Sequence, residues 1–171
     1  AVQTSLDSGN LSLLEALRRR AESLSLAVYL VGGPLRDVLL GMPIKDLDLV
    51  VEGDAPALAR QLSEELDGRL LVHTRFGTAT VTLGSSRLDL ATARKEVYPR
   101  PAALPQVSPG TLEDDLARRD FSINALALSL TEPCPSIRDP HDGAGDIGRG
   151  LIRVLHRRSF ADDPTRILRA V

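Results

Sequence analysis

Asp46 and Asp48 are the pair of residues best placed to do chemistry. They lie in the run DLDLVV at 46–51, which alternates and then becomes fully apolar, as expected of a strand. Residues i and i+2 of a strand point to the same face, so Leu47 and Leu49 should face a core while both carboxylates face away from it. Two carboxylates on one rigid edge can hold Mg²⁺ ions that also bind phosphate oxygens. The polar face of an exposed edge strand would show the same pattern, so this pair alone leaves both interpretations open.

A third aspartate favours the metal interpretation. Asp89 lies between two leucines in a second alternating run at 87–93, and it should also point away from the core. If the two strands are neighbours, three carboxylates share one face, which costs free energy unless cations neutralise them. Two-metal catalysis uses such a set, because one ion activates an attacking 3′ hydroxyl and the other steadies a triphosphate leaving group. The three aspartates therefore predict a site for two Mg²⁺ ions.

A phosphate-binding turn is predicted upstream of this pair. Gly32 and Gly33 end an apolar run at 26–31, and Pro34 suits the first turn of a helix. Glycines at such a junction let the backbone approach a phosphate, and the helix N-terminus offers free N–H groups. Arg36 would lie in the first turn of that helix, near the same phosphates. An ordinary strand–helix turn with Arg36 on the surface is the alternative.

The elements around these residues are predicted to form a mixed sheet with helices packed against it. Helices are expected near 11–25, with Ser12 and Glu15 as a capping box, at 34–40 and 54–67, and from Thr111 through 118–120. Further strands are expected at 69–73, 77–83 and 125–130, with a short strand or turn at 151–155 and a helix starting near Asp162. Residues 94–110 contain four prolines and are predicted to be irregular, and the segment 139–150 is rich in Gly and Asp. No GxGxxG sequence follows the first strand, which excludes a Rossmann fold.

The charge of the 171 residues is unevenly distributed. Residues 1–148 carry 15 Lys and Arg against 21 Asp and Glu, whereas residues 149–171 carry six Arg against Asp162 and Asp163. An acidic body with a basic end suits a metal centre beside a surface for a polyanion, although scattered arginines on a solvated helix would give the same balance. No apolar run is long enough to span a membrane and no secretory signal is present, which predicts a cytoplasmic protein or a chain trimmed at its N-terminus. The single cysteine, Cys134, excludes an internal disulfide.

Five segments in a fixed order resemble one family. They are GGPLRDVLLGMPIKDLDLVV, ARKEVYPRPAALPQV, LARRDFSINALAL, DPHDGAGDIGRGLIRVL and FADDPTRILRAV, and together they extend over residues 26–171. They are similar to the head domain of class II tRNA nucleotidyltransferases and bacterial poly(A) polymerases, within the DNA polymerase β-like superfamily. The resemblance implies an α+β nucleotidyltransferase head at 1–155 and the start of a helical neck at 156–171. It also implies a longer protein, because neck, body and tail domains follow the head in this family.

The resemblance implies a role for each matching residue. Metal binding falls to Asp46, Asp48 and Asp89, and the triphosphate side to Gly32, Gly33, Arg36 and Asp37. Binding of the ribose 2′-hydroxyl and the phosphates falls to Arg118, Arg119, Asp120 and Asn124, because a carboxylate can accept from a hydroxyl while arginines clamp phosphate. Asp162, Asp163 and Arg166 would pair with the incoming base, and Arg169 would also bind the nucleotide. Without the other segments, Asp162 and Asp163 before Pro164 would be interpreted as a helix cap.

The chain departs from the family in three places. Ser122 and Asp162 stand where Thr and Glu are common, and both replacements keep the chemical function. The stretch DPHDGAGD lacks the usual double glycine, which weakens the hinge role that the resemblance would assign to it.

These features predict a template-independent RNA nucleotidyltransferase that adds A, or CCA, to the 3′ end of tRNA from ATP and CTP. Protein side chains would select the base, and no membrane partner is expected. The segment KEVYPRPAALPQV is complete, whereas CC-adding members of the family tend to lack an intact loop there, which favours addition of the terminal A. A poly(A) polymerase has the same head motifs and is the alternative enzyme. A non-catalytic nucleotide- or RNA-binding relative is a further alternative, but it has no need for three clustered carboxylates.

Overall fold

The computed structural model describes residues 6–44 and 46–170, so the first five residues of the predicted head and Val171 of the predicted neck lie outside it. The α-helices are α1 (Ser8–Ser23), α2 (Gly33–Leu39), α3 (Ala55–Leu66), α4 (Leu112–Ala117), α5 (Gly143–Arg149) and α6 (Ser159–Asp162). Within the described ranges, the 3₁₀ helices are η2 (Thr74–Phe76), η3 (Ser122–Asn124) and η4 (Pro164–Ala170). The strands are β1 (Ala27–Val31), β2 (Leu47–Glu52), β3 (Arg69–His73), β4 (Thr78–Leu83), β5 (Ser86–Thr92), β6 (Arg94–Val97), β7 (Gln106–Pro109), β8 (Ala127–Ser129) and β9 (Ile137–Arg138).

Seven strands form one mixed sheet in the order β3-β4-β5-β2-β1-β8-β9. Its neighbouring strands run antiparallel except β2 and β5, which pair in parallel. The β2–β5 register sets Asp48 beside Asp89 and Leu49 beside Leu90. The predicted mixed sheet is therefore confirmed, and its one parallel pair joins the two strands that carry the aspartates.

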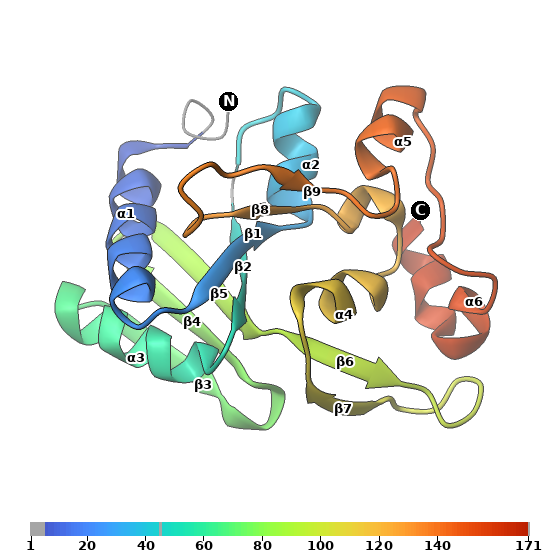
Figure 1. Ribbon diagram of the computed structural model, residues 1–171, viewed down its shortest axis with the longest axis horizontal. Helices are drawn as coiled ribbons and strands as arrows, with labels where there is room; N and C mark the ends of the chain where they lie inside the picture. Colours follow the sequence, from blue (N-terminus) through green and yellow to red (C-terminus); the bar gives the residue numbers. More distant parts are fainter. Residues whose placement is uncertain (1–5, 45, 171) are drawn as a thin grey trace.

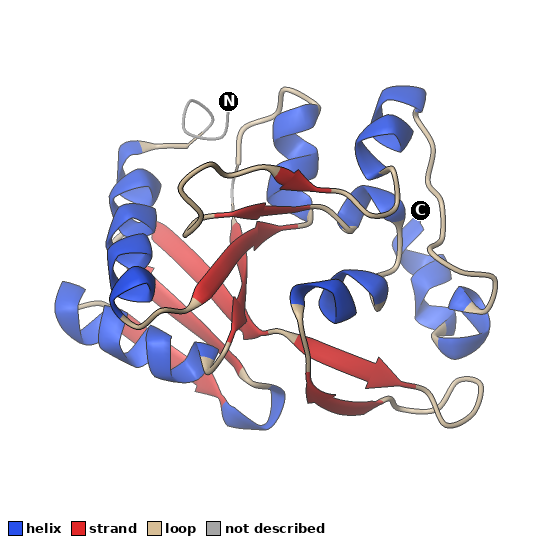
Figure 2. Cartoon of the chain, viewed as in Figure 1, coloured by secondary structure: helices blue, strands red, loops and turns tan. Residues whose placement is uncertain are grey.

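The two faces of this sheet are covered by different elements (Figures 1 and 2). α1 and α3 lie together on one face, over a core that includes Leu47, Leu49, Leu88 and Leu90. These four leucines are at most 1% exposed. On the other face, α4 packs over a smaller cluster that includes Tyr29. The alternation of β2 and β5 therefore buries their leucines under α1 and α3 and turns their aspartates to the opposite side.

Several predicted elements have a different extent in the structure. The first helix begins at Ser8 with Asp7 as its cap, so the predicted capping box is wrong and Ser12 lies inside the helix, donating to the Ser8 carbonyl. The segment 94–110 is irregular only at 98–105 and at Gly110, because β6 and β7 pair as a hairpin whose strand prolines are confined to the final residue of β7. The Gly- and Asp-rich segment 139–150 includes helix α5.

Two further boundaries differ near the predicted site. α4 ends at Ala117, so Arg118 is its C-cap and the run at 118–120 follows the helix instead of lying within it. The helix predicted to start near Asp162 starts at Pro164 as η4, just after α6 ends at Asp162. Proline suits this first helical position because its missing N–H would be unpaired there in any case.

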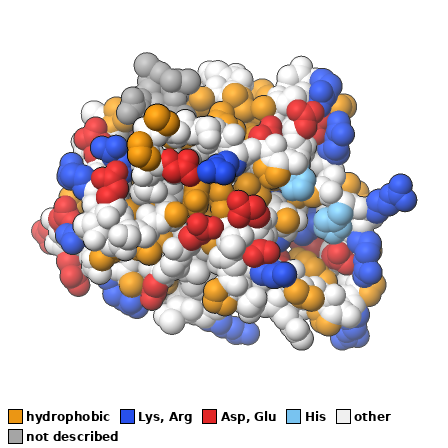
Figure 3. All heavy atoms as spheres, in the orientation of Figure 1, with side chains coloured by type: hydrophobic (Ala, Val, Ile, Leu, Met, Phe, Trp, Pro, Cys, Tyr) orange, Lys and Arg blue, Asp and Glu red, His pale blue; other side chains and the backbone are white. Residues whose placement is uncertain are grey.

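Lys and Arg side chains gather at the end of the molecule that carries α5 and α6 (Figure 3). This end contains most of the basic segment 149–171 identified in the sequence. Across the two described ranges, no helix has the length and apolar character needed to cross a bilayer.

Candidate active site

β2 and β5 place two of the predicted metal-binding carboxylates in one row. Asp46 immediately precedes β2 and is exposed, Asp48 is also exposed, and the leucines that alternate with them are buried, as predicted. Asp48 and Asp89 are direct partners in the parallel register. Side chains of paired residues in neighbouring strands point to the same face, so Asp89 lies beside Asp48.

Negative charge dominates around Asp48. Its pKa is raised, first because surrounding atoms displace water from the carboxylate and second because the Asp89 carboxylate is close. Asp46 raises the pKa of Asp48 further, while the Arg119 guanidinium acts in the opposite direction. A cation bound among these carboxylates would remove the penalty, because it favours the charged form of each.

Asp89 also has partners within the protein. It accepts a hydrogen bond of 2.5 Å from the Thr80 hydroxyl and pairs with Arg87, whose Nε lies 2.9 Å from Oδ2. Among the described residues, no three His, Cys, Asp or Glu side chains gather closely enough to hold a metal ion by themselves. The donor set nevertheless fits Mg²⁺, which is usually bound by one or two carboxylates while substrate phosphates and water complete the shell. The arrangement fits an ion that a triphosphate helps to hold.

Gly32, which follows β1, lets the backbone approach the Arg119 side chain closely. Its φ of +66° is a conformation that favours glycine, and a Cβ at this position would lie 2.8 Å from Arg119 Nη1. Arg36 in α2 donates to Asn124 Oδ1 at 2.8 Å and to Asp37 Oδ1 at 2.9 Å. Arg36 is therefore half-buried and tied to the site, unlike the surface arginine of an ordinary strand–helix turn.

One buried carboxylate anchors both arginines of the Arg118–Arg119 pair. Asp115 is 0% exposed and accepts from Arg118 Nη2 at 2.6 Å and from Arg119 Nη2 at 2.9 Å. Glu96 on β6 also accepts from Arg118, at 3.3 Å. A guanidinium carries five N–H donors in a rigid fork, so each arginine keeps donors for a phosphate after binding Asp115.

Asp120 lies at the start of the turn formed by residues 120–124. Its Oδ1 accepts from the Phe121 N–H at 2.8 Å and from Asn124 Nδ2 at 3.0 Å, and its Oδ2 accepts from Arg169 Nε at 3.1 Å. Burial by itself would raise the pKa of Asp120, but the hydrogen bonds from Asn124, Phe121 and Arg169 outweigh it, and the pKa is lowered. Asp120 is therefore held ionised, as an acceptor, at the edge of the site.

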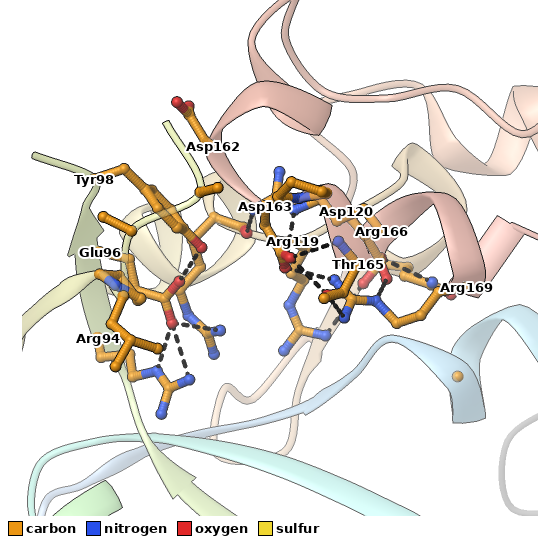
Figure 4. Close-up of a pocket in the computed structure, with 18 of the residues that line it drawn as sticks. Arg94, Glu96, Tyr98, Arg119, Asp120, Asp162, Asp163, Thr165, Arg166 and Arg169 are labelled. Atoms are coloured by element: carbon orange, nitrogen blue, oxygen red, sulfur yellow. Dashed lines mark hydrogen bonds and ion pairs between the residues drawn. The ribbon is translucent and has the colours of Figure 1, made fainter. Parts of the chain in front are cut away.

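Asp163 is linked to Asp120 through Arg169. Arg169 Nη2 lies 2.9 Å from Asp163 Oδ2, and the Thr165 N–H donates to Asp163 Oδ1 at 3.0 Å (Figure 4). Burial opposes ionisation of Asp163, but the hydrogen bonds from the Thr165 hydroxyl, Arg169 and the Thr165 N–H outweigh it, and the pKa of Asp163 is lowered. A single arginine thus connects the carboxylate expected to bind the ribose with one expected to bind the base.

Arg166 is buried and bonded within the protein, whereas the sequence assigned it to the incoming base. It is 2% exposed and donates to Ser159 Oγ at 2.6 Å and to the Arg118 carbonyl at 2.8 Å. Its Nε lies 3.8 Å from Asp163 Oδ2 and has no hydrogen-bond partner among the described residues. Asp162 has one buried oxygen, Oδ1, that likewise accepts no hydrogen bond within the described ranges.

These residues surround a pocket of about 900 Å³. Eleven predicted site residues line it: Gly33, Arg36, Asp48, Arg118, Arg119, Asp120, Asn124, Asp162, Asp163, Arg166 and Arg169. The pocket lining does not include Gly32, Asp37, Asp46 or Asp89. Asp48 is thus the point at which the row of carboxylates meets the arginine-rich cavity.

Two acidic residues of the site were missed in the sequence. Asp115 precedes Arg118 and Arg119 by three and four residues, a spacing typical of ion pairs on a helix, so it could have been found. Glu96 binds Arg94, Arg118 and the Tyr98 hydroxyl, and all four residues line the pocket. Its position depends on the β6–β7 hairpin, which the prolines of that segment concealed.

Comparison with known proteins agrees with this architecture. The family described as Poly A polymerase head domain matches residues 28–153. A protein of Halalkalibacterium halodurans named A-adding tRNA nucleotidyltransferase is 47% identical over 169 residues, which are 97% of this chain and 39% of that protein. A protein of Deinococcus radiodurans named CC-adding tRNA nucleotidyltransferase is 44% identical over 159 residues, which are 92% of this chain and 42% of that protein. The solved structure of the Thermotoga maritima CCA-adding enzyme complexed with tRNA has a TM-score of 0.83 at 40% identity, and the match covers 99% of this chain and 38% of that one.

The mixed sheet, with its paired aspartates beside an arginine-rich pocket, has the fold of a nucleotidyltransferase head. The chain belongs to the poly(A) polymerase head-domain family. It spans 39% and 42% of the length of the two relatives named above.

Proposed function

We propose that this head transfers a nucleotide from ATP, or from CTP and ATP, to the 3′ end of tRNA. The observation that carries the proposal is the β2–β5 register, which sets Asp48 beside Asp89 at the wall of a pocket lined by arginines. A row of carboxylates next to guanidinium groups is the charge pattern that a metal–triphosphate requires. The similarity to tRNA nucleotidyltransferases supports the choice of tRNA as the acceptor.

The carboxylates would hold two Mg²⁺ ions. Asp46 and Asp48 would be the main ligands, and Asp89 would join them by releasing Arg87. When bound, the ions supply activation of the 3′ hydroxyl and neutralisation of the triphosphate. The protein's own contribution is to keep these carboxylates on one rigid strand pair, so that little rearrangement is needed when the nucleotide arrives.

The arginines and the 120–124 turn would hold the rest of the nucleotide. Arg36, Arg118 and Arg119 bring positive charge to the pocket wall for the phosphates. Asp120, held ionised, can accept a hydrogen bond from a ribose 2′-hydroxyl. Asp163 would accept from the exocyclic amino group that A and C share, next to a ring nitrogen that an arginine donor can reach.

The choice of nucleotide rests on the segment between β5 and α4. Overall identity does not decide it, because an A-adding relative and a CC-adding relative are 47% and 44% identical to this chain. In this chain the segment is complete and forms the β6–β7 hairpin, with Glu96 bonded to Arg118. CC-adding members tend to lack an intact loop in this segment, so the hairpin favours addition of the terminal A.

The experiment is an extension assay with three tRNA transcripts, ending before CCA, after C and after CC. Each is incubated with the protein, Mg²⁺ and labelled CTP or ATP. An A-adding enzyme extends only the transcript ending in CC, by one A, whereas a CCA-adding enzyme extends all three. Long A tracts would indicate a poly(A) polymerase instead. If no transcript is extended beyond the level of an Asp48→Asn control, the proposal is wrong.

A further inference from the structure

The 120–124 turn is held from behind by a buried carboxylate outside the pocket. Asp146 in α5 is 0% exposed, and its Oδ2 accepts a hydrogen bond of 2.6 Å from the hydroxyl of Ser122. Ser122 is itself only 1% exposed and is the middle residue of the turn, two positions from Asp120 and two from Asn124. Neither Ser122 nor Asp146 lines the pocket.

The backbone around Ser122 is packed against the same region. The Ser122 N–H donates to the Arg153 carbonyl at 2.9 Å, and Phe121 forms a β-bridge with Val154. A Cβ at Gly143 would lie 2.2 Å from the Ser122 carbonyl oxygen, so the start of α5 is pressed onto the turn. The turn therefore has a fixed position relative to α5. The hydrogen bond from the Ser122 hydroxyl to Asp146 is the side-chain tie between them.

Asp146 is available for this tie because two arginines keep it ionised. Arg149 and Arg153 each place Nη2 2.8 Å from Asp146 Oδ1, which leaves Oδ2 for Ser122. The hydrogen bonds from Arg149 and then from Ser122 lower the pKa of Asp146 to about 2. Hydrogen bonds to a charged acceptor are stronger than those between neutral groups, so the tie is a strong one.

We propose that Asp146, acting through Ser122, is a positioning residue that sets the 120–124 turn for recognition of the ribose 2′-hydroxyl. This inference rests on the proposed function, because it names a determinant of nucleotide selectivity at the same site. Asp120 and Asn124 bind each other across the turn at 3.0 Å, so a shift of Ser122 between them moves both. Asp120 would then no longer meet the 2′-hydroxyl at hydrogen-bonding distance. Arg36, which donates to Asn124 at 2.8 Å, would move with the turn and weaken binding of ATP and dATP alike, whereas Arg118 and Arg119 remain anchored on Asp115.

The test compares Ser122→Ala with Ser122→Thr and with Ser129→Ala. Threonine keeps the hydroxyl. Ser129, on β8, is a matched control. It is also 1% exposed, and its hydroxyl oxygen accepts a hydrogen bond of 3.1 Å from the Glu132 N–H. Two quantities are measured for each protein: kcat/KM for ATP and dATP on tRNA, and the Kd of each nucleotide in equilibrium binding. Thermal unfolding is recorded for every variant.

Ser122→Ala is expected to lower the preference for ATP over dATP by about tenfold, through loss of affinity for ATP, the size of effect typical of one hydrogen bond to a charged group. Ser122→Thr should keep the wild-type preference, and Ser129→Ala should keep it even if its Tm falls. A Ser122→Cys variant, which fills the same space with a weak donor, should give an intermediate preference if the alanine variant folds poorly.

The inference is overturned if Ser122→Ala retains the wild-type ATP-to-dATP ratio, or if Ser129→Ala loses the ratio equally. Failure of the proposed function has a different signature, because the wild-type protein would then extend no tRNA. The binding measurement still compares ATP with dATP in that case, so an unchanged ratio of Kd values between wild type and Ser122→Ala counts against the positioning role independently.

Discussion

The carboxylates of this molecule fall into two groups with opposite electrostatics. In the row on β2 and β5, Asp48 lies beside Asp89 and Asp46, and its pKa is raised. Around the 120–124 turn, Asp120 and Asp163 accept from Arg169 and from backbone N–H groups, and their pKa values are lowered. In the first group, Arg87 and Arg119 do not offset burial and the neighbouring carboxylates, whereas in the second group the hydrogen-bond donors outweigh burial.

This difference distinguishes two ways of holding a nucleotide. The arginine-bound carboxylates have their geometry fixed before a ligand arrives, which suits recognition of ribose and base. The strand carboxylates carry an unfavourable concentration of negative charge, which suits a site completed by cations from solution. Each of the following predictions changes one side of this contrast.

The largest effect is expected from Asp48→Ala. Loss of a metal ligand removes charge stabilisation worth several kcal/mol in the transition state, so kcat/KM should fall by about a thousandfold or more. The melting temperature should not fall, because the Asp48 side chain faces away from the core. Steady-state extension of tRNA and a thermal melt measure the two quantities, with Glu64→Ala, an exposed carboxylate on α3, as control. Near-normal transfer by Asp48→Ala in Mg²⁺ would rule out its role as a metal ligand.

Asp115→Asn should greatly lower the stability of the protein, whereas Asp48→Ala should not. Removing the buried negative charge leaves Arg118 and Arg119 without their shared partner, at a cost of roughly 3 kcal/mol. Urea unfolding followed by circular dichroism measures this change. Glu113→Gln on the same helix is exposed and should have little effect. An unchanged unfolding midpoint for Asp115→Asn would show that the two arginines are held by other contacts.

Asp120→Ala should change selectivity more than activity. The hydrogen bond expected from the 2′-hydroxyl to this carboxylate is worth about 1.5–3 kcal/mol, so the preference for ATP over dATP should fall by roughly tenfold to a hundredfold. Competition between ATP and labelled dATP on tRNA ending in CC measures the preference. Asp120→Asn, which keeps an acceptor oxygen, should lose less. Equal losses for both nucleotides would place Asp120 in a purely structural role.

The smallest effect concerns pH. Between the unfolded-state pKa of Asp, about 3.9, and the raised folded-state pKa of Asp48, the folded state binds more protons than the unfolded state. The contribution of Asp48 to stability therefore falls as the pH rises through this window. Asp120 and Asp163 behave oppositely, because their lowered pKa values make stability fall as the pH drops below about 3.9.

Asp48→Asn should remove the loss of stability that the wild-type protein undergoes as the pH rises above about 3.9. Melting temperatures at pH 4 to 7 measure it, with and without Mg²⁺. Mg²⁺ should stabilise the wild-type protein more at pH 7 than at pH 4 and should stabilise the Asn variant less. Identical pH profiles for the two proteins would show that the crowded carboxylates carry no net penalty.

Local patterns in the sequence determined much of this molecule. The alternation at 46–51 placed Leu47 and Leu49 in the core because the period of a strand depends only on backbone geometry. The helix predicted at 54–67 forms as α3, and Asp54 caps it by accepting from the Ala57 N–H, because capping involves residues three apart. The order of the family motifs indicated the fold, and the sheet confirms it.

Contacts between distant segments were decided only by the tertiary structure. Asp48 and Asp89 become neighbours because β2 and β5 pair in parallel although α3, β3 and β4 separate them in the sequence, and no local signal specifies that register. The burial of Arg166 depends on the carbonyl of Arg118, and the tie between Asp146 and Ser122 depends on where α5 packs. The sequence by itself determined which chemical groups are present and which face of each strand they occupy, since these depend on a few adjacent residues. The partners that hold those groups, and hence their charge states, were decided by packing between segments far apart in the chain.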